Sequence, residues 1–597
     1  MCGINAIFRY NQVTEKDKKS LKAMNQQMHY RGPDGEGYWN DEHCALAHTR
    51  LGIIGTQNGT QPLYNADKSL ILICNGEIYN YIELKKNLQA KEFIFQTDTD
   101  CEVILYLYEL YGLEFVHYLR GMFAFCLYDT REQQLIVARD RIGEERVYYA
   151  EVPCGVVFSS ELKAILSEYM PNPQLNMEAL LAPIRFTGGI SKRDTWIEQI
   201  KRVLPGEMLI INANGVQRKQ YWERKRTYDF SGTLEDAHKE TLRLMQEAVD
   251  IEMRSDVPVA VMLSGGVDSS AVAALAKLSG HEVHTITTGY TGVHAEDERN
   301  VAERFAKEQG FIYHEIELSE KDYLDSFDEL VAYLDEPMTD STAIAQWAMF
   351  KKVKELGFKV LLGGMGGDEL FYGYPAWNNL GNSLRIRREH EAIFPWRGHK
   401  MEWVQFMAKN WKYVLKAGSP AKLEDKSYGW WIHDDYYRFL KNAKLRLGDE
   451  VIDLEDYRYK IQKGFSLCAA GKEIDAIYDD CIDTVMTQAY LYLSDRLTMG
   501  CSLEGRSPLL DYKFVEHVMS LPLEYKYVSG KPKQYLKDIL AGIVPDYILY
   551  ACKRGFTSPP SFVINVALNY KYQCFKSDYK FYNSVLADRI LSLLWKK

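Results

Sequence analysis

The chain has 597 residues, of which 46% are hydrophobic and 26% charged, so it is long enough to fold as two or more domains. A net charge of −10 and a pI near 5.8 argue against a general nucleic-acid-binding or membrane-surface protein, because such proteins need basic faces. The 11 cysteines stand singly and without metal-ligand spacing, so we expect reduced thiols, no structural zinc and a cytoplasmic protein.

The N-terminal segment MCGINAIFRYNQ has no basic region followed by an apolar run, and no later apolar run approaches a membrane span. Between residues 69 and 162, apolar extended stretches alternate with polar turns, which predicts antiparallel strands with a hairpin connection at 130–134. Helices are predicted at 15–29 and 100–112. We therefore expect a layered α+β domain over residues 2–205.

Residues 204–222 still have strand character, but 225–237, KRTYDFSGTLEDA, are polar and rich in turn residues, and we predict a linker at 206–240. Beyond it, four strand-like segments alternate with helical patterns: 257–264, 282–290, 311–318 and 359–364. This alternation predicts a parallel sheet with crossover helices, so we expect an α/β domain over residues 241–597. Residues 384–480 are rich in Trp, Tyr and basic residues, and we interpret them as helical additions.

Cys2 is a candidate nucleophile at the start of the chain. Removal of Met1 would place its thiol beside a free α-amino group. An α-amine has a pKa of roughly 8 and can accept the thiol proton directly or through water. A cysteine at position two is more often incidental, so this interpretation depends on further motifs.

Four such motifs follow MCGI in the first region: HYRGPDGEG (29–37), AHTRLGIIG (47–55), CNGEIYN (74–80) and TDCEVILYLYELYG (99–112). In this order they resemble the glutaminase domains of asparagine synthetases. The resemblance implies an N-terminal-nucleophile fold, layered αββα, in which Cys2 attacks glutamine to release glutamate and ammonia.

The same resemblance implies roles for five more residues. Arg50 would clamp the α-carboxylate of glutamine and Asp100 its α-ammonium group. Asn75, by its side-chain amide, and Gly76, by its backbone N–H, would stabilise the oxyanion, and Glu77 would help to fix the substrate. If each motif stood alone, the simpler interpretation would be a solvated surface residue for Arg50, a helix cap for Asp100 and a turn for Asn75-Gly76. The ordered set of motifs favours the glutaminase.

Residues 261–276, VMLSGGVDSSAVAALA, form an apolar strand, a Ser-Gly-Gly turn and a small-residue helix. Such a turn lets backbone N–H groups and the helix dipole face an anion. The segment resembles the pyrophosphate loop of ATP pyrophosphatases; the alternative is a plain strand-to-helix turn with Asp268 as N-cap. Five later motifs follow the order of the asparagine synthetase synthetase domain: LDEPMTDSTAIAQW (334–347), LLGGMGGDELFYGY (361–374), CSLEGRSPLLDYKFVEHV (501–518), GKPKQYLKDIL (530–540) and KRGFTSPP (553–560).

This second resemblance implies ATP and Mg²⁺ as cofactors. Asp268 and Asp368 would supply magnesium carboxylates, and Lys533 would neutralise charge on the phosphates. The pyrophosphate would be held by Ser264, Gly265, Gly266, Asp268, Ser269 and Ser270, and the adenine and ribose would be bordered by Leu263, Thr288 and Gly364. The implied partners are small molecules, namely glutamine, ATP and a carboxylate, and a homodimer is left open.

The chain departs from the family at several places. Residues 139–149 read RDRIGEERVYY where members commonly read RDRxGxKPLYY, which would alter the domain interface. SLEGR replaces SLEVR and YLYLSDRLTMG (490–500) replaces DDxLxKxDRxSM, so the substrate side of the synthetase domain is the more divergent. Met365 stands where asparagine synthetases usually have Glu or Asp, and a thioether carries no charge. Three explanations compete: the substrate lacks an amine at that spot, the proton role passes to Glu369 or water, or the adenylating step is lost.

We therefore predict an ATP-dependent glutamine amidotransferase that converts a carboxylate to an amide through an acyl-AMP intermediate. Aspartate is the nominal substrate, giving asparagine, glutamate, AMP and pyrophosphate. One alternative is amidation of a different carboxylate, such as a uronic acid of a surface polysaccharide. The other is a noncatalytic nucleotide-binding scaffold.

Overall fold

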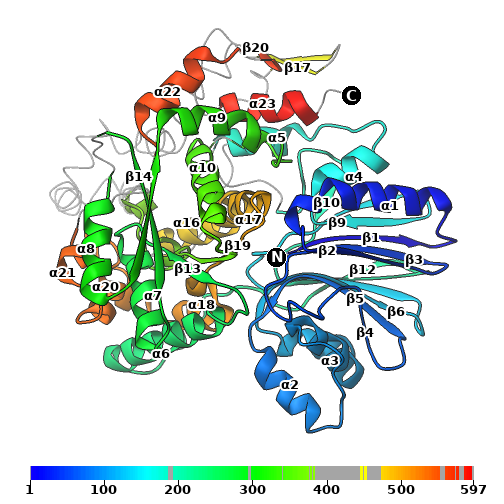
Figure 1. Cartoon of the computed structure of the whole chain (residues 1–597), viewed down its shortest axis with the longest axis horizontal. Helices are drawn as coiled ribbons and strands as arrows, with labels where there is room; N and C mark the ends of the chain where they lie inside the picture. Colours follow the sequence, from blue (N-terminus) through cyan, green and yellow to red (C-terminus); the bar gives the residue numbers. More distant parts are fainter. Residues whose placement is uncertain are drawn as a thin grey trace, which may run out of the picture.

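The computed structural model (Figure 1) describes residues 2–185, 192–292, 297–338, 340–375, 377–378, 381–382, 444–447, 450–453, 472–551, 558–571, 573–576 and 584–594. Most of the predicted helical additions at 384–480 and most of the KRGFTSPP motif lie outside these residues. The N-terminal region forms a sandwich of two sheets, and the C-terminal region packs helices around a third sheet beside it (Figure 1).

Two antiparallel six-stranded sheets make the sandwich, with strand orders β10-β8-β9-β1-β3-β2 and β12-β11-β7-β6-β5-β4. The first consists of β1 (Gly3–Arg9), β2 (Gly35–Asn40), β3 (Cys44–Arg50), β8 (Tyr148–Val152), β9 (Gly155–Ser159) and β10 (Lys201–Arg202). The second consists of β4 (Leu63–Tyr64), β5 (Leu70–Ile78), β6 (Gly121–Asp129), β7 (Gln134–Arg139), β11 (Glu207–Asn212) and β12 (Gly215–Gln220). The predicted hairpin at 130–134 is confirmed, since β6 and β7 pair with Asp129 opposite Gln134.

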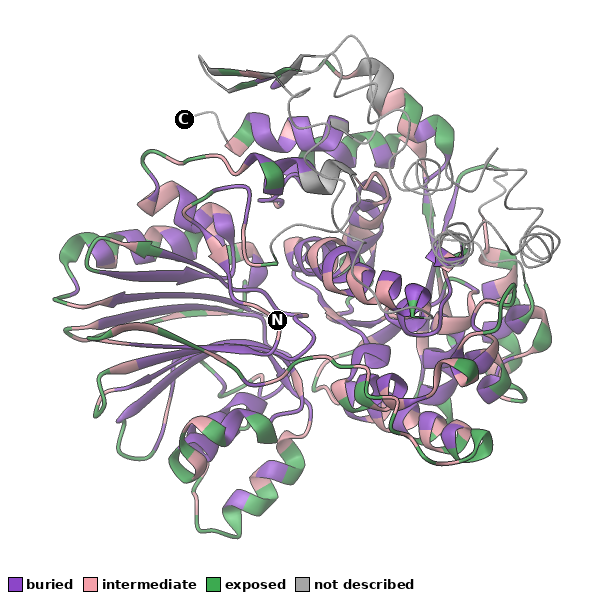
Figure 2. Cartoon of the chain, turned by 180° about the vertical axis from the view of Figure 1, so that it is seen from behind, coloured by how far each residue is buried: buried purple, intermediate pink, exposed green. Residues whose placement is uncertain are grey.

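The central strands of each sheet, such as β1 and β5, are buried on both faces. Successive residues of a strand point to opposite sides of the sheet, so each strand contributes to two cores. Ile4 and Ala6 of β1 share one apolar core with Ile71 of β5, between the sheets, whereas Ile7 faces the opposite side. Helices α1 (Glu15–Gln27) and α4 (Leu162–Tyr169) cover the outside of one sheet, and α2 (Tyr81–Gln89) and α3 (Val103–Tyr111) the outside of the other (Figures 1 and 2). The predicted αββα architecture and both predicted helices are confirmed.

The predicted linker at 206–240 contains sheet strands. β11 pairs with β7 and β12 with β11, so both complete the second sheet of the sandwich. β11 is apolar and buried between its neighbours, and the more exposed β12 forms the edge of the sheet, so the predicted linker begins too early. The next helix, α6 (Leu234–Glu252), begins with Thr233 as N-cap. We therefore propose that the linker proper covers residues 221–233.

The second domain contains a five-stranded parallel sheet with the order β15-β14-β13-β16-β19. Its strands are β13 (Val259–Met262), β14 (His284–Tyr290), β15 (Ile312–Leu318), β16 (Val360–Leu362) and β19 (Glu504–Arg506). The first four agree with the predicted segments. Successive strands run outward from β13 on one side and then return to its other side at β16, so the strand order reverses between β13 and β16. Ligands of open α/β sheets bind at such a reversal, beyond the carboxyl ends of the strands.

Helices cover both faces of this sheet. They are α7 (Val267–Leu278), α8 (Arg299–Gln309), α9 (Glu320–Val331), α10 (Thr342–Glu355), α17 (Leu491–Gly500), α18 (Tyr512–Ser520) and α20 (Gln534–Leu540). α16 (Glu473–Cys481), a π-helix (Ile482–Tyr490) and α17 follow one another without a break. Within the described residues, none of the helices combines the length and apolar character needed to cross a membrane.

The prediction of helical additions at 384–480 is confirmed at 473–480, where α16 lies, and is wrong at 444–447 and 450–453. β17 (Lys444–Leu447) and β18 (Glu450–Asp453) pair as a hairpin, which β20 (Phe575–Lys576) extends. Alternation in KLRL, with Leu445 buried, explains the strand.

Candidate active sites

Cys2 lies directly before β1, between the end of β3 and the middle of β5. Its backbone N–H donates to Asn75 Oδ1 at 2.5 Å, and the Leu51 N–H donates to its Sγ at 3.4 Å. The side chain is only 7% exposed, and burial raises the pKa of the thiol to about 12. The thiol is therefore protonated at neutral pH, and a base must accept its proton before it can attack.

The two predicted oxyanion residues are adjacent on β5. Gly76 has φ +139°, and a Cβ there would lie 2.1 Å from the Met122 carbonyl oxygen, so no other residue fits. Asn75 is fully buried; its Nδ2 donates to Glu145 Oε2, while its Oδ1 accepts from Cys2. Since an amide nitrogen carries two hydrogens, one remains available to an oxyanion.

Arg50 and Asp100, the predicted substrate clamps, are buried. The Arg50 guanidinium donates to the carbonyl oxygens of Gly55 at 2.6 Å and Thr56 at 3.3 Å, which argues against a solvated surface residue. Asp100 Oδ2 accepts the Ile78 N–H at 2.6 Å. This bond fixes Asp100 against β5, so its carboxylate does more than cap a helix. Burial raises the pKa of Asp100.

Glu77 reaches the boundary between the domains. Its carboxylate lies 3.9 Å from Arg506 Nη2, on β19 of the second domain. Burial, and then the charge of Asp100, raises the pKa of Glu77 well above its usual range. Glu77 Oε2 has no hydrogen-bond partner among the described residues. The first site therefore adjoins the second domain on this side.

The predicted phosphate loop joins β13 to α7 at the reversal of strand order. Gly265 has φ +73°, and Gly266, the N-cap of α7, leaves the first turn without a side-chain cap. The Ser264 N–H donates to Ser269 Oγ at 3.1 Å, which folds the loop back onto the helix. Leu263, at the start of the loop, is 1% exposed. A glycine turn that leads into a helix N-terminus is an arrangement that suits an anion.

Features around this loop fit a nucleotide. Among the described residues, the hydroxyls of Ser270 and Thr288 are buried without a hydrogen-bond partner. A Cβ at Gly364 would lie 2.7 Å from the Asp268 Cβ, so glycine lets the loops after β13 and β16 meet. Both loops are thereby held at one edge of the sheet, where the resemblance places ATP.

Three charged residues from distant motifs converge there. Lys533 Nζ contacts Asp268 Oδ2 and lies 2.7 Å from Asp368 Oδ1. Burial lowers the pKa of Lys533, but the charges of Asp268 and Asp368 raise it overall, so it stays cationic. Among the described residues no group of three His, Cys, Asp or Glu side chains forms a metal site. Two carboxylates completed by phosphate oxygens suit Mg²⁺, which is commonly held in this way.

Met365 and Glu369 lie beside these charges but have different surroundings. Met365 is half-buried and packs against the apolar cluster that joins the two domains. Glu369 Oε1 accepts from the Tyr374 hydroxyl at 2.7 Å, and Oε2 accepts from the Gly366 N–H at 3.1 Å. Burial, and then the charge of Asp368, raises the pKa of Glu369.

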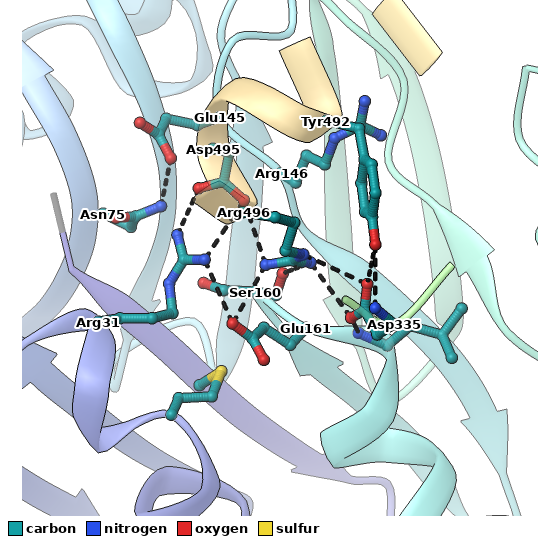
Figure 3. Close-up of polar contacts among 12 residues, drawn as sticks. Arg31, Asn75, Glu145, Arg146, Ser160, Glu161, Asp335, Tyr492, Asp495 and Arg496 are labelled. Carbon is teal, nitrogen blue, oxygen red and sulfur yellow. Dashed lines mark hydrogen bonds and ion pairs between the residues drawn. The ribbon is translucent and has the colours of Figure 1, made fainter. Parts of the chain in front are cut away.

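A buried network of ionic side chains joins the two domains (Figure 3). Arg31 Nη2 donates to Asp495 Oδ1 at 2.6 Å, and Arg496 Nη1 donates to Glu161 Oε1 at 3.2 Å. Arg496 also donates to both carboxylate oxygens of Asp335. Arg31 Nε donates to the Cys2 carbonyl oxygen at 2.8 Å, so this network also holds the nucleophile's backbone.

Sequence reasoning missed the functional position of several of these residues: Arg31, Glu145, Asp495 and Arg496. Signals were present in the sequence: Arg31 lies in the motif HYRGPDGEG, Asp495 and Arg496 lie in the divergent segment YLYLSDRLTMG, and Glu145 lies in the departure RDRIGEER, which predicted an altered domain interface. Arg146 confirms that RDRIGEER lies at the interface, since its Nη2 donates to the Thr487 carbonyl oxygen of the second domain.

Comparisons with known proteins agree with both halves of this arrangement. Residues 1–222 match the glutamine amidotransferase domain and residues 240–565 match asparagine synthase. The chain is 32% identical to glutamine-hydrolyzing asparagine synthetase 1 of Bacillus subtilis (strain 168), over 94% of this chain and 87% of that protein. Identity is 30% to asparagine synthetase 3 of the same strain, over 93% and 87%. Amidase chry2 of Gibberella zeae is 29% identical, over 94% and 89%. The chain therefore belongs to the glutamine-hydrolysing asparagine synthetase family of carbon–nitrogen ligases, which take their nitrogen from glutamine.

Proposed function

We propose that this protein activates a carboxylate with ATP as an acyl-AMP and amidates it with ammonia released from glutamine, with aspartate as the nominal substrate. The observation that carries this proposal is the convergence of Asp268, Asp368 and Lys533 at the reversal of strand order, in a chain that also places Cys2 against Asn75. A noncatalytic scaffold has no need of both arrangements.

In the first half-reaction, Cys2 Sγ attacks the side-chain carbonyl of glutamine after its proton passes to the α-amine or to water. The oxyanion that forms is stabilised by Asn75 Nδ2 and the Gly76 N–H. Collapse of the tetrahedral intermediate expels ammonia and leaves a thioester, which water hydrolyses to glutamate. Arg50 and Asp100 hold the charged end of the substrate during both steps.

In the second half-reaction, an oxygen of the substrate carboxylate attacks the α-phosphorus of ATP, and pyrophosphate leaves. The phosphate loop binds the leaving group through its N–H groups, and Lys533 offsets its negative charge. Magnesium, when held by Asp268 and Asp368, would neutralise more of that charge. Ammonia then attacks the acyl carbon and displaces AMP, giving the amide.

Ammonia has to travel between the sites without gaining a proton, because ammonium has no lone pair. One continuous apolar cluster includes Leu51, which contacts Cys2, together with Met122 and Ile142 of the first domain. The same cluster includes Leu263 and Leu362 beside the phosphate loop. We propose that ammonia crosses this apolar contact, where water is excluded.

A second candidate function, amidation of a carboxylate that carries no α-ammonium group, is favoured by the surroundings of Met365. Met365 presents apolar surface, and both Glu369 oxygens already accept hydrogen bonds. An ammonium group at position 365 would meet a thioether in place of a carboxylate, and Glu369 is held by Tyr374 and Gly366. A uronic acid or a peptide carboxylate would meet no such penalty.

The test is pyrophosphate release from ATP across a panel of carboxylates: aspartate, glutamate, free and nucleotide-linked uronic acids, and peptides. Turnover with aspartate alone would support the nominal substrate and sink the second candidate. If another carboxylate is preferred, Met365→Glu should raise the relative rate with aspartate. Absence of pyrophosphate release with every carboxylate would support the scaffold.

We further propose a cytoplasmic location. The nine cysteines described are free, as expected of reduced thiols.

A further inference from the structure

Glu145 is a buried carboxyl group that contacts the glutaminase site (Figure 3). Its side chain is 0% exposed, and its Oε2 accepts a hydrogen bond from Asn75 Nδ2. We propose that Glu145 is a positioning residue of this site, whose carboxyl group holds the Asn75 amide in the orientation that stabilises the oxyanion. This inference rests on the glutaminase half of the proposed function.

The two ends of the Asn75 amide have nearly the same shape. Rotating the amide by 180° would point its nitrogen at the Cys2 N–H, where two donors would oppose each other. The Cys2 N–H therefore selects the orientation of the amide. The Glu145 carboxyl group accepts from Nδ2 in this orientation and holds the amide in place, so that the second Nδ2 hydrogen is free for the substrate.

The backbone around Glu145 is itself held rigidly. The Asp140 carboxylate accepts the N–H groups of Gly143 at 2.6 Å, Glu144 at 3.1 Å and Glu145 at 2.9 Å. Arg139 Nε donates to the Glu145 carbonyl oxygen at 2.5 Å. A side chain on so constrained a backbone can hold its partner with little loss of entropy.

The next residue anchors this segment to the other domain. Arg146 is 2% exposed, its guanidinium lies 5.1 Å from the centre of the Tyr492 ring, and it donates to the Thr487 carbonyl oxygen. Thr487 belongs to the π-helix, and such irregular turns are frequent at functional sites. Contact between the domains thus places the segment that carries Glu145.

The charges around Glu145 favour its neutral form. Burial, and then the negative charge of Asp495, raises the pKa of Glu145 well above its usual range, while Arg31 lowers it and Asp140 raises it further. A neutral carboxyl group still accepts through its carbonyl oxygen. It also places no negative charge beside the developing oxyanion, which an ionised group would repel.

The test compares Glu145→Gln, which keeps a neutral acceptor, with Glu145→Met, which has similar length and no acceptor. Glutamate release from glutamine is measured in the full-length protein. We expect kcat to stay within about threefold for Glu145→Gln and to fall about tenfold or more for Glu145→Met. KM for glutamine should change little in either, because Arg50 and Asp100 are untouched.

A double-mutant cycle distinguishes positioning from general damage. If Glu145 acts through Asn75, the double variant Asn75→Ala/Glu145→Met should have a kcat within about twofold of that of Asn75→Ala alone. Thermal stabilisation by MgATP should be unchanged in all variants, which reports that the second domain is folded.

Equal losses in Glu145→Gln and Glu145→Met, or a full additional loss in the Asn75→Ala background, would overturn the inference. So would wild-type kcat in Glu145→Met. Wild-type protein that releases no glutamate would contradict the proposed function and the inference together. If the wild-type protein releases glutamate and Glu145→Met releases it at the same rate, only the inference is contradicted.

Discussion

The two candidate sites differ in how their polar groups are paired. At the glutaminase site, both ends of the Asn75 amide and the Asp100 carboxylate are bonded to protein groups. At the nucleotide site, Lys533 lies between two carboxylates, and the Ser270 hydroxyl has no hydrogen-bond partner among the described residues.

This difference follows from the ligands proposed for each site. Glutamine carries one positive and one negative charge and reacts at a neutral amide, so a prepaired, buried site suits it. ATP brings several negative charges and a metal ion, so a site with a cation, two carboxylates and a hydroxyl that is unpaired within the described part of the chain suits it. If the two sites behave as separate units, a substitution at one should leave the reaction at the other unchanged.

The largest expected effect is that of Cys2→Ala. Glutamate release should fall by about a thousandfold or more, because the nucleophile is lost. Pyrophosphate release with ammonium chloride as nitrogen source should persist, which would separate the two sites cleanly. The matched control is Cys154→Ala, since Cys154 is exposed. Loss of ammonium-dependent activity in Cys2→Ala would contradict the comparison.

Lys533→Met is expected to act on the other site alone. Removing the cation between Asp268 and Asp368 should lower pyrophosphate release about a hundredfold or more, because charge on the leaving group is no longer offset. Glutamate release should stay within about threefold. Lys531→Met serves as control, as Lys531 is exposed on the same segment. Pyrophosphate release that survives in Lys533→Met would remove Lys533 from the mechanism.

The buried ionic network sharpens the comparison because Arg31 links it to the nucleophile of the first site. Glu161→Gln leaves Arg496 and Arg31 with too little negative charge around them and should destabilise the protein by about 3 kcal/mol at pH 7. We expect a lower unfolding midpoint in urea. Glutamate release should fall more than binding of MgATP, because Arg31 holds the Cys2 backbone.

The same variant has a defined pH dependence. Burial raises the pKa of Glu161, but the charges of Lys163 and Arg496 lower it to about 2 overall. Since the folded pKa lies below the unfolded value, the stabilisation is present above about pH 4.5 and is lost as the pH falls toward 2. The stability difference between wild type and Glu161→Gln should narrow over that range. A constant difference would show that Glu161 is not ionised in the folded state.

The smallest effect is expected for Lys359→Met. Lys359 Nζ lies 2.7 Å from Asp34 Oδ2 across the domain boundary, but the two side chains are 35% and 37% exposed. Such a pair contributes about 0.5 kcal/mol or less, and salt screens it. Neither half-reaction should change. A stability loss as large as that of Glu161→Gln would mean that burial does not determine how much each of these ion pairs stabilises the protein.

Much of the fold followed from local patterns. The alternation in β5 and β6 and the helical pattern before Gly112 predicted the layers of the first domain, since period and turn chemistry act over a few residues. The strand character of residues 204–222 indicated β11 and β12, but the predicted linker was extended backward over them from the polar, turn-rich stretch that follows. The hairpin at 444–453 was missed because composition says little about pairing with a distant strand.

By itself, the sequence determined the reactive groups: a thiol at Cys2, a glycine-rich phosphate loop, and the carboxylates and lysine that the motifs carry. Only the tertiary structure decided which of them meet. Asn75 and Glu145 lie 70 residues apart, and Arg31 and Asp495 lie 464 apart. Buried polar groups are stable only when paired, and their partners come from the packing of the two domains, which no local pattern encodes.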